Sequence, residues 1–272
     1  MSKSSLLSAP TPLVMGVLNV TPDSFSDGAK YHHLDLAAKR ALQMIEEGVD
    51  IIDIGGESTR PGASEVELDE ELKRVVPLIE KIAPLGVPIS IDTSKPEVMR
   101  AAINAGAHMV NDVRALQENG AIDAVAELGC PVCLMHMQGQ PRTMQNNPEY
   151  IDVVEEVADF LAKRITACTA KGIDKDLICV DPGFGFGKSL AHNLSLLNNL
   201  SHLEKLGVPV LAGMSRKSML GQITGKDVNE RLAASLAVAL IAMQNGAKII
   251  RVHDVKETVD VRNVYLAALS AN

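Results

Sequence analysis

Residues 50–69 read DIIDIGGESTRPGASEVELD and contain the unit from which the whole chain is built. A short run rich in isoleucine, residues 50–54, ends in a polar loop with glycines, residues 55–62, and a helical pattern begins near Asp69. Runs of this kind are largely apolar rather than strictly alternating, which is typical of parallel strands covered on both faces. The stretch therefore predicts one strand–loop–helix unit of an α/β protein.

The same unit occurs eight times along the chain. The predicted strands are Leu13–Val20, Asp50–Ile54, Pro88–Asp92, His108–Asn111, Pro131–His136, Leu177–Asp181, Pro209–Ala212 and Lys248–Val252. The predicted helices begin near Leu34, Asp69, Pro96, Ala121, Ile151, His192, Asn229 and Val255. Eight such units in one chain predict a (β/α)8 TIM barrel, although the pattern alone also allows an open doubly wound sheet.

We expect one domain over residues 1–272, because no linker, charge block or low-complexity segment divides the chain, and we expect residues 1–11 to be a flexible N-terminus. Apolar residues make up 46% of the chain, and aromatic residues only 3%, so the core must be aliphatic. The net charge of −8 disfavours nonspecific binding to nucleic acid or anionic lipid. No run has the length of a signal-peptide core or a membrane span, and we expect a cytoplasmic protein.

Four cysteines fit a reducing compartment. Cys130 and Cys133 form a C-x-x-C sequence within a predicted strand. Residues three apart on a strand point to opposite faces, so we expect buried thiols rather than a disulfide or a metal site.

Polar clusters follow seven of the eight predicted strands, and a barrel brings these strand ends to one face. Carboxylate and amide acceptors suit a ligand edge with several N–H donors, cations suit phosphate, and a neutral oxygen suits Mg2+ that keeps its waters. The acceptors are Asp92, Asn111 and Asp181, the cations are Arg60, Lys217, Arg251 and His253, and the neutral oxygen is that of Asn19.

Each of these residues also has a structural interpretation. Asp92 or Asp112 alone could be a helix cap, a single Arg or Lys is usually a solvated charge, and His136 is more simply a satisfied core histidine. The segment after residue 181, PGFGFGKS, resembles a phosphate-binding P-loop, but Pro182 stands at the position of its first glycine. The glycines are better explained by a turn or by close approach to a flat ligand.

Seven segments together resemble the signature of bacterial dihydropteroate synthases, in order and at the right spacing. They are residues 19–28 (NVTPDSFSDG), 55–62 (GGESTRPG), 90–95 (SIDTSK), 110–112 (VND), 181–187 (DPGFGFG), 215–217 (SRK) and 251–253 (RVH). The resemblance covers nearly the whole chain from about residue 13. It implies condensation of a dihydropterin diphosphate with 4-aminobenzoate, with release of pyrophosphate.

The resemblance also implies roles for individual residues. The pterin would be bound by Asp92, Asn111, Met135, Asp181, Phe186, Gly213, Lys217 and Arg251, the last of which would stack over the ring. The diphosphate would lie near Asn19, Thr59, Arg251 and His253, with Asn19 on Mg2+. The 4-aminobenzoate pocket would contain Phe25, Arg60, Pro61, Lys217 and Ser218.

In the chemistry that the resemblance implies, diphosphate leaves before the amine attacks, because an electron-rich dihydropterin stabilises a cation at its exocyclic methylene. Asp92, Lys217, Arg251 and His253 would be the catalytic groups. Sulfonamide inhibitors and a homodimer are further expectations of the family. Two alternatives are a pterin-dependent methyltransferase on the same barrel, which would not need the diphosphate set, and a non-catalytic paralogue, which would be expected to have lost the residues of the first two loops.

The implied 4-aminobenzoate pocket generates a prediction about inhibitors. Sulfonamides resemble the substrate but extend beyond its outline, so substitutions of Phe25 or Pro61 should weaken sulfonamide inhibition more than they raise the KM for 4-aminobenzoate. Steady-state kinetics of both variants test this. A strictly parallel loss of inhibitor and substrate affinity would show that neither residue distinguishes the two.

Overall fold

Each of the eight predicted runs forms a strand in the computed structural model, with ends at or within two residues of the predicted ones. The strands are β1 (Leu13–Asn19), β2 (Ile51–Gly55), β3 (Ile89–Asp92), β4 (Met109–Asp112), β5 (Val132–Met135), β6 (Ile178–Asp181), β7 (Leu211–Ala212) and β8 (Ile249–Val252). The structure describes residues 6–20, 30–57, 66–139, 144 and 148–271, and of residues 30–32 the backbone alone.

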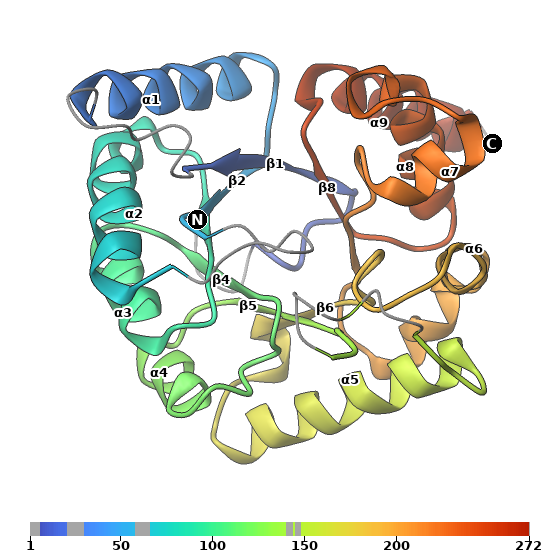
Figure 1. Cartoon of the computed structure of the whole chain (residues 1–272), viewed down its shortest axis with the longest axis horizontal. Helices are drawn as coiled ribbons and strands as arrows, with labels where there is room; N and C mark the ends of the chain where they lie inside the picture. Colours follow the sequence, from blue (N-terminus) through green and yellow to red (C-terminus); the bar gives the residue numbers. More distant parts are fainter. Residues whose placement is uncertain (1–5, 21–29, 58–65, 140–143, 145–147, 272) are drawn as a thin grey trace.

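The strands are parallel and pair in the order β6-β5-β4-β3-β2-β1-β8-β7. A parallel bridge between Val180 and Val210 joins the two ends of this order and closes the ring. The closed ring, seen end-on in Figure 1, is the predicted (β/α)8 barrel and excludes an open doubly wound sheet.

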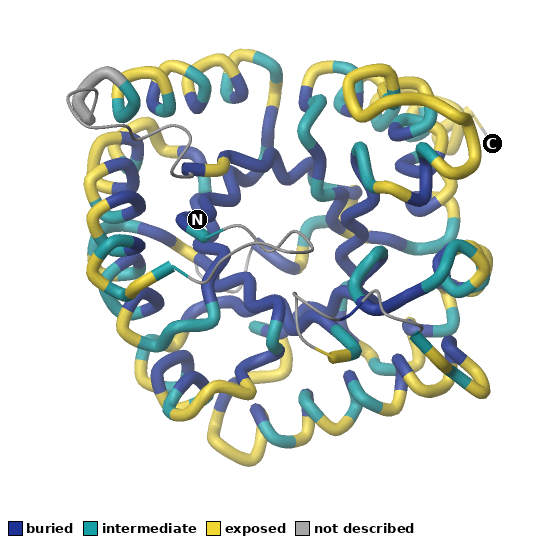
Figure 2. Tube along the Cα trace, viewed as in Figure 1, coloured by how far each residue is buried: buried dark blue, intermediate teal, exposed yellow. Residues whose placement is uncertain are grey.

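Helices surround the ring and expose their outer faces, while the strands are almost continuously buried (Figure 2). The α-helices are α1 (Lys30–Glu46), α2 (Leu68–Ile82), α3 (Pro96–Asn104), α4 (Ala121–Leu128), α5 (Val153–Ala170), α6 (Leu190–Asn198), α7 (Ser218–Thr224), α8 (Leu232–Gln244) and α9 (Val255–Ser270). Short 3-10 helices span Ala83–Leu85, Lys175–Leu177, Leu200–Leu206 and Val228–Glu230. Among the described residues, no helix is both long enough and apolar enough to cross a membrane.

Two helix positions differ from the prediction. Helix α1 begins four residues before Leu34. The helix predicted near Asn229 is α8, which begins at Leu232, and the preceding helix α7 was not predicted. Helix α7 has only seven residues and ends at Gly225, whose φ of 69° is left-handed. Such a short segment has too few apolar repeats for periodicity to show it.

The interior of the barrel has an apolar floor. Its buried members are Leu6, Leu7, Met15, Ile51, Met109, Cys133, Cys179, Leu211 and Ile249. Leu6 and Leu7 are each only 7% exposed, so these two residues pack against the floor.

The four cysteines are free and buried, as predicted. Cys130, just before β5, belongs to the outer core between strands and helices, whereas Cys133 in β5 belongs to the inner floor, so the two thiols lie on opposite sides of the strand layer. Cys133 instead pairs in register with Cys179 of β6 and shares a thiol hydrogen bond with it.

Candidate functional site

Polar side chains occupy the inward positions directly above the apolar floor. Side chains of a strand alternate between its two faces, so a residue two positions after a floor residue also points into the barrel. The pairs of floor and upper residue are Ile51 and Asp53, Met109 and Asn111, Cys133 and Met135, Cys179 and Asp181, and Ile249 and Arg251. The upper half of the barrel interior is therefore a polar chamber that opens toward the ends of the strands.

Arg251 lies at the centre of this chamber between two carboxylates. Its Nε donates to Asp53 Oδ2 and its Nη2 to Asp92 Oδ2, each at 2.7 Å. Asp53 also accepts from the side-chain amide of Asn111 at 3.2 Å. Asp53 is fully buried, and its Oδ1 has no hydrogen-bond partner among the described residues.

The surroundings of Asp92 in the chamber raise its pKa. Burial raises its pKa to about 7, because the attraction of Arg251 is outweighed by burial together with the repulsion of Asp53, Asp112 and Glu71. One carboxylate of the chamber thus changes its charge in the physiological range.

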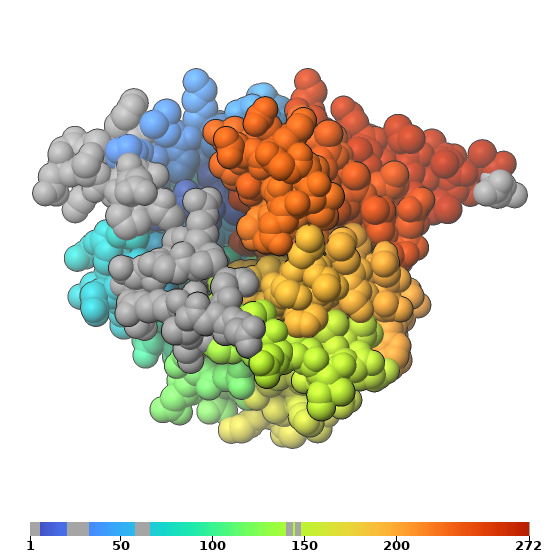
Figure 3. Space-filling view, turned by 45° about the vertical axis from the view of Figure 1, so that its right-hand side comes forward, coloured from blue at the N-terminus to red at the C-terminus, as the bar shows by residue number. Residues whose placement is uncertain are grey.

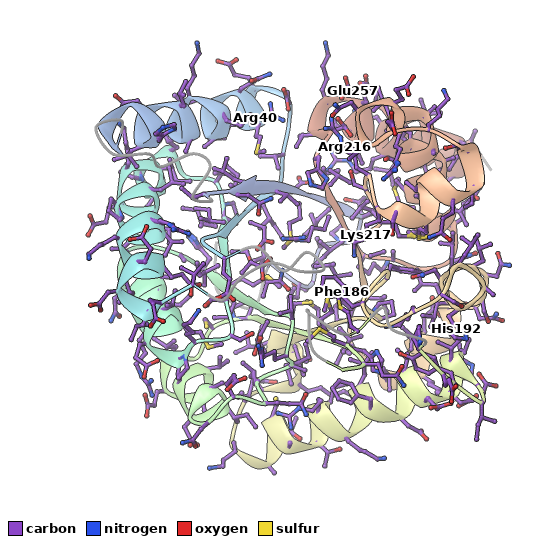
Figure 4. The ribbon with its side chains drawn as sticks, viewed as in Figure 1. Arg40, Phe186, His192, Arg216, Lys217 and Glu257 are labelled. Atoms are coloured by element: carbon purple, nitrogen blue, oxygen red, sulfur yellow. The ribbon has the colours of Figure 1, made fainter. Side chains whose placement is uncertain are left out.

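Asp181 and Lys217 face each other on the opposite side of the chamber. Burial raises the pKa of Asp181, while Lys217, the Gly183 N–H and Arg251 act against this rise. Burial lowers the pKa of Lys217 to about 8, and Asp181 opposes that shift. Lys217 donates to the carbonyl of Phe184, and its ammonium lies 4.6 Å from the centre of the Phe186 ring (Figure 4).

The predicted wall residues line the space between these groups. Met135 pairs in register with Asp181 and is 4% exposed. A Cβ on Gly213 would lie 3.7 Å from Arg251 Cβ and 3.9 Å from Asp181 Oδ2, so this glycine keeps open the space between the two side chains. The predicted pterin residues therefore lie around one chamber.

Asn19 and His253 lie at the open ends of β1 and β8. A Cβ on Gly55 would lie 3.4 Å from Asn19 Oδ1 and 3.7 Å from Asp92 Cβ, which places the Asn19 amide beside the chamber. His253 Nδ1 lies 3.1 Å from Ser215 Oγ. Asn19 and His253 therefore lie nearer the open end of the barrel than the acceptor side chains of the chamber.

The segment 215–217 is held in a strained conformation. Arg216 has a φ of 59°, which is uncommon for a residue with a side chain. Ser235 accepts from its backbone N–H at 3.0 Å, Arg231 donates to its carbonyl at 3.0 Å, and its guanidinium pairs with Asp254. The guanidinium thus turns away from the chamber while Lys217 turns toward it (Figure 4).

Ser218 begins α7 at the edge of a cavity of about 360 Å³. Gly185, Lys188 and Gln222 also line this cavity, and its other lining residues belong mainly to α6 and α7. Figure 3 shows the orange segment that contains α7 next to the amber segment that contains α6. The cavity has room for a small molecule next to Lys188 and Ser218. Phe25, Thr59, Arg60 and Pro61 lie outside the described residues.

The alternatives for two residues are resolved by their contacts. Asp112 is fully buried and accepts from Ser94 Oγ and from the backbone N–H groups of Arg114 and Leu116, so it braces the turn after β4. His136 is a buried core histidine, as predicted, and its Nδ1 lies 2.9 Å from the ammonium of Lys188.

The donor set limits how a metal ion can bind. Within the part of the chain that the structure describes, no group of three or more His, Cys, Asp or Glu side chains could hold a metal ion. Mg2+ characteristically keeps several waters and binds substrate phosphates with one or two protein oxygens. The Asn19 amide oxygen could be one such ligand of Mg2+, with the other ligands supplied by substrate phosphate and water.

Two residues of the site were not predicted. Asp53 was read as part of an apolar strand, although its spacing from Ile51 shows that it points inward. Lys188 was considered only as the lysine of an apparent P-loop, and its burial could not be read from that motif.

The fold and the chamber belong to a known class. Residues 15–253 match the family model of pterin binding enzymes. The chain is 56% identical to the dihydropteroate synthase of Escherichia coli over 96% of this chain and 93% of the relative. The chain belongs to the dihydropteroate synthase family.

Solved structures agree with this assignment. A Yersinia pestis dihydropteroate synthase with a sulfonamide drug has a TM-score of 0.91 and 53% identity, covering 96% of this chain and 95% of that one. A Xanthomonas albilineans dihydropteroate synthase in complex with 7,8-dihydropteroate has a TM-score of 0.87 and 50% identity, with the same shares covered.

The raised pKa of Asp92 predicts how stability depends on pH. The folded chain binds a proton on Asp92 between pH 3.8 and about 7 where the unfolded chain does not, so this group stabilises the fold at low pH and the contribution is lost as pH rises through about 7. Asp92→Asn cannot ionise. We expect its free energy of unfolding, relative to wild type, to rise across this window in urea titrations.

Asp123→Asn is the matched control, because Asp123 is exposed and pairs with Lys171 on the surface. The difference in free energy of unfolding between Asp123→Asn and wild type should change much less over the same pH range. A constant difference for Asp92→Asn, or one that falls as pH rises, contradicts the assigned charge balance.

Proposed function

We propose that the chain condenses (7,8-dihydropterin-6-yl)methyl diphosphate with 4-aminobenzoate to 7,8-dihydropteroate and pyrophosphate. The observation that carries the proposal is the buried chamber in which Asp181, Asn111 and Asp92 present acceptors beside two cations, Lys217 and Arg251. A flat ring with several N–H donors and a polar carbonyl edge matches this set of groups.

In this assignment Asp181 accepts from the 2-amino and N3–H edge of the pterin, and Asn111 and Asp92 hold its other polar groups. Lys217 reaches the carbonyl side of the ring. Arg251 stacks over the ring, and the ion pairs that it makes with Asp53 and Asp92 orient its guanidinium for that contact. Met135 and Phe186 supply the apolar wall.

Asn19, Arg251 and His253 would receive the diphosphate, together with Thr59, which lies outside the described residues. Asn19 would hold Mg2+ jointly with the diphosphate and water, and the ion would supply charge stabilisation to the leaving group. Arg251 and His253 add donors at the same end of the barrel.

The reaction breaks the bond between the exocyclic methylene carbon and the diphosphate oxygen, and the electron pair leaves with the diphosphate. The dihydropterin carries the resulting positive charge, which Asp92 stabilises electrostatically. The amine of 4-aminobenzoate then forms the carbon–nitrogen bond with its lone pair and loses a proton to water. This amine is neutral near pH 7, so no strong general base is assigned.

The 4-aminobenzoate would lie between Lys217 and Ser218, with its carboxylate near the start of α7. The cavity that Ser218 lines supports this position. Phe25, Arg60 and Pro61 would complete the pocket, and sulfonamides would compete for it.

The function is tested by measuring pyrophosphate and pterin products with purified chain and Mg2+. We expect equal amounts of pyrophosphate and 7,8-dihydropteroate, which requires 4-aminobenzoate. Asp181→Asn should lose about 2–4 kcal/mol of pterin binding in calorimetry, because an amide N–H2 would face the ring donors.

Different failures have different meanings. Methyl transfer from a folate without any pyrophosphate release would favour the methyltransferase alternative, and pterin binding without turnover would favour a non-catalytic paralogue. Unchanged pterin affinity in Asp181→Asn would show that Asp181 only braces the turn after β6.

We propose further that the chain is a cytoplasmic homodimer that uses the outer face of α8. This helix has 13 residues and no charged side chain, and Leu232, Ala233, Ala237, Ile241 and Gln244 are exposed on it. An uncharged stripe of this kind is typical of a surface covered by a second copy. Buried free thiols fit the reducing cytoplasm.

Ile241→Glu should therefore convert the dimer to a monomer in sedimentation experiments, since it places a charge in the middle of the stripe. Leu85→Glu is a suitable control, because Leu85 is similarly exposed at 41% but lies at the end of a 3-10 helix on a different part of the barrel. A wild-type monomer, or an Ile241→Glu dimer, contradicts the proposed interface.

A further inference from the structure

The turn after β6 ends in a buried lysine to which the proposed reaction assigns no role. Lys188 is only 3% exposed. Its Nζ donates to the carbonyls of Gly183 at 2.9 Å and Phe186 at 3.0 Å, and it lies 2.9 Å from His136 Nδ1. These contacts use all three hydrogens of the ammonium, so Lys188 does not bind phosphate as a P-loop lysine does.

The turn lies directly on the loop after β5. A Cβ on Gly183 would lie 1.8 Å from the His136 carbonyl oxygen, and a Cβ on Gly187 would lie 2.5 Å from that of Gln138. Both glycines have positive φ, so no other residue fits there without strain. Side chains cannot join the two loops at these points, and the Lys188 ammonium joins them by hydrogen bonds.

We propose that Lys188 is a positioning residue of the pterin site: its ammonium fixes the turn that carries Phe186 and places a positive charge behind the carboxylate of Asp181. The inference rests on the proposed role of Asp181 in pterin binding. It adds a residue that acts on the ring only through its neighbours.

The connection to Asp181 is short. The Gly183 N–H donates to Asp181 Oδ1 at 2.7 Å, and the Gly183 carbonyl accepts from Lys188. Gly183 is therefore held on both sides, and its N–H fixes one carboxylate oxygen. The other oxygen, Oδ2, faces the chamber near Gly213.

The charges on both sides of Asp181 matter for its ionisation. Burial raises its pKa, and Lys217, the Gly183 N–H, Arg251 and Lys188 oppose the rise. Burial lowers the pKa of Lys188 to about 7, with Asp181 raising it and Lys217 lowering it further. Burial and the neighbouring Lys188 lower the pKa of His136 to about 3, so the ring is a neutral acceptor at pH 7.

The sign of the coupling follows from these groups. Protonated Lys188 favours ionised Asp181, and ionised Asp181 favours protonated Lys188. Loss of the Lys188 charge must therefore raise the pKa of Asp181, and a ligand that needs the Asp181 carboxylate must lose affinity at a higher pH than before.

The test is calorimetry of a pterin without diphosphate, from about pH 5.5 to 8.5, on wild type and Lys188→Met. Methionine keeps the length of the stem but has no charge and no donors. We expect about tenfold weaker binding at the acid end of this range, and the fall in affinity at acid pH should begin at a higher pH than in wild type. Asp92 also titrates in this range, but it is present in both proteins.

Two comparisons separate charge from turn structure. Tyr150→Phe removes the 2.9 Å hydrogen bond from the Tyr150 hydroxyl to the Gly187 carbonyl, which lies on the same turn, and does not change the charge. It should change the pterin affinity by the same factor at every pH. In an Asp181→Asn background, Lys188→Met should not move the pH dependence. A wild-type profile for Lys188→Met, or the same shift without Asp181, overturns the inference.

The outcomes also distinguish this inference from the function itself. Absence of pterin binding by wild type contradicts the proposed function, whereas pterin binding that depends on Asp181 but not on Lys188 contradicts the inference alone.

A second measurement needs no substitution of Lys188. The Cε resonance of Lys188, followed by NMR in 13C-lysine protein, should titrate at lower pH in Asp181→Asn than in wild type, because the attracting carboxylate is gone. Equal midpoints in the two proteins contradict the coupling even if Lys188→Met does not fold.

Discussion

The site depends on the ion pairs that Arg251 makes inside the closed barrel. The side chains directly above the apolar floor have no access to bulk water from the floor side. A charged side chain at this level must therefore be paired with a neighbouring charge or with a ligand. Arg251 matches Asp53 and Asp92 at once, at 2.7 Å each. Loss of one member of such a buried set typically costs about 3–5 kcal/mol, because it leaves an uncompensated charge.

The same constraint explains the electrostatics of the chamber. Three carboxylates, Asp53, Asp92 and Asp181, share the interior with two cations, Arg251 and Lys217, and a third cation, Lys188, stands behind the wall. Lys188 adds a positive charge to this set, and burial raises the pKa of Asp92 to about 7. A ring with several donors would satisfy the remaining acceptors, which is the property expected of a pterin site.

Much of this could be predicted from sequence because the barrel repeats one rule. Seven of the eight apolar runs end in a polar cluster, and a parallel barrel brings those ends together. Asp92, Asn111, Asp181 and Arg251 could therefore be predicted to lie at one end of the barrel. Asp53 was not predicted as a site residue, because DIIDI was read as a single apolar strand. Its position two residues after the inward-facing Ile51 indicates that its carboxylate also points inward.

Other features depend on contacts between distant parts of the chain. The left-handed Arg216 needs Ser235, Arg231 and Asp254 to hold it, and nothing local in SRK predicts that conformation. The Lys188 contact with His136 joins residues 52 positions apart. Leu6 and Leu7 likewise gain their role only when a closed barrel provides a floor to cover.

The central claim is that the pterin ring binds inside the barrel, above the floor and against Asp181. A crystal structure of the chain with the dihydropterin diphosphate and Mg2+ tests it most directly. We expect the polar edge of the ring against Asp181 and Asn111, with the diphosphate beside Asn19 and His253. A ring bound outside the chamber, in the cavity between α6 and α7, would contradict it.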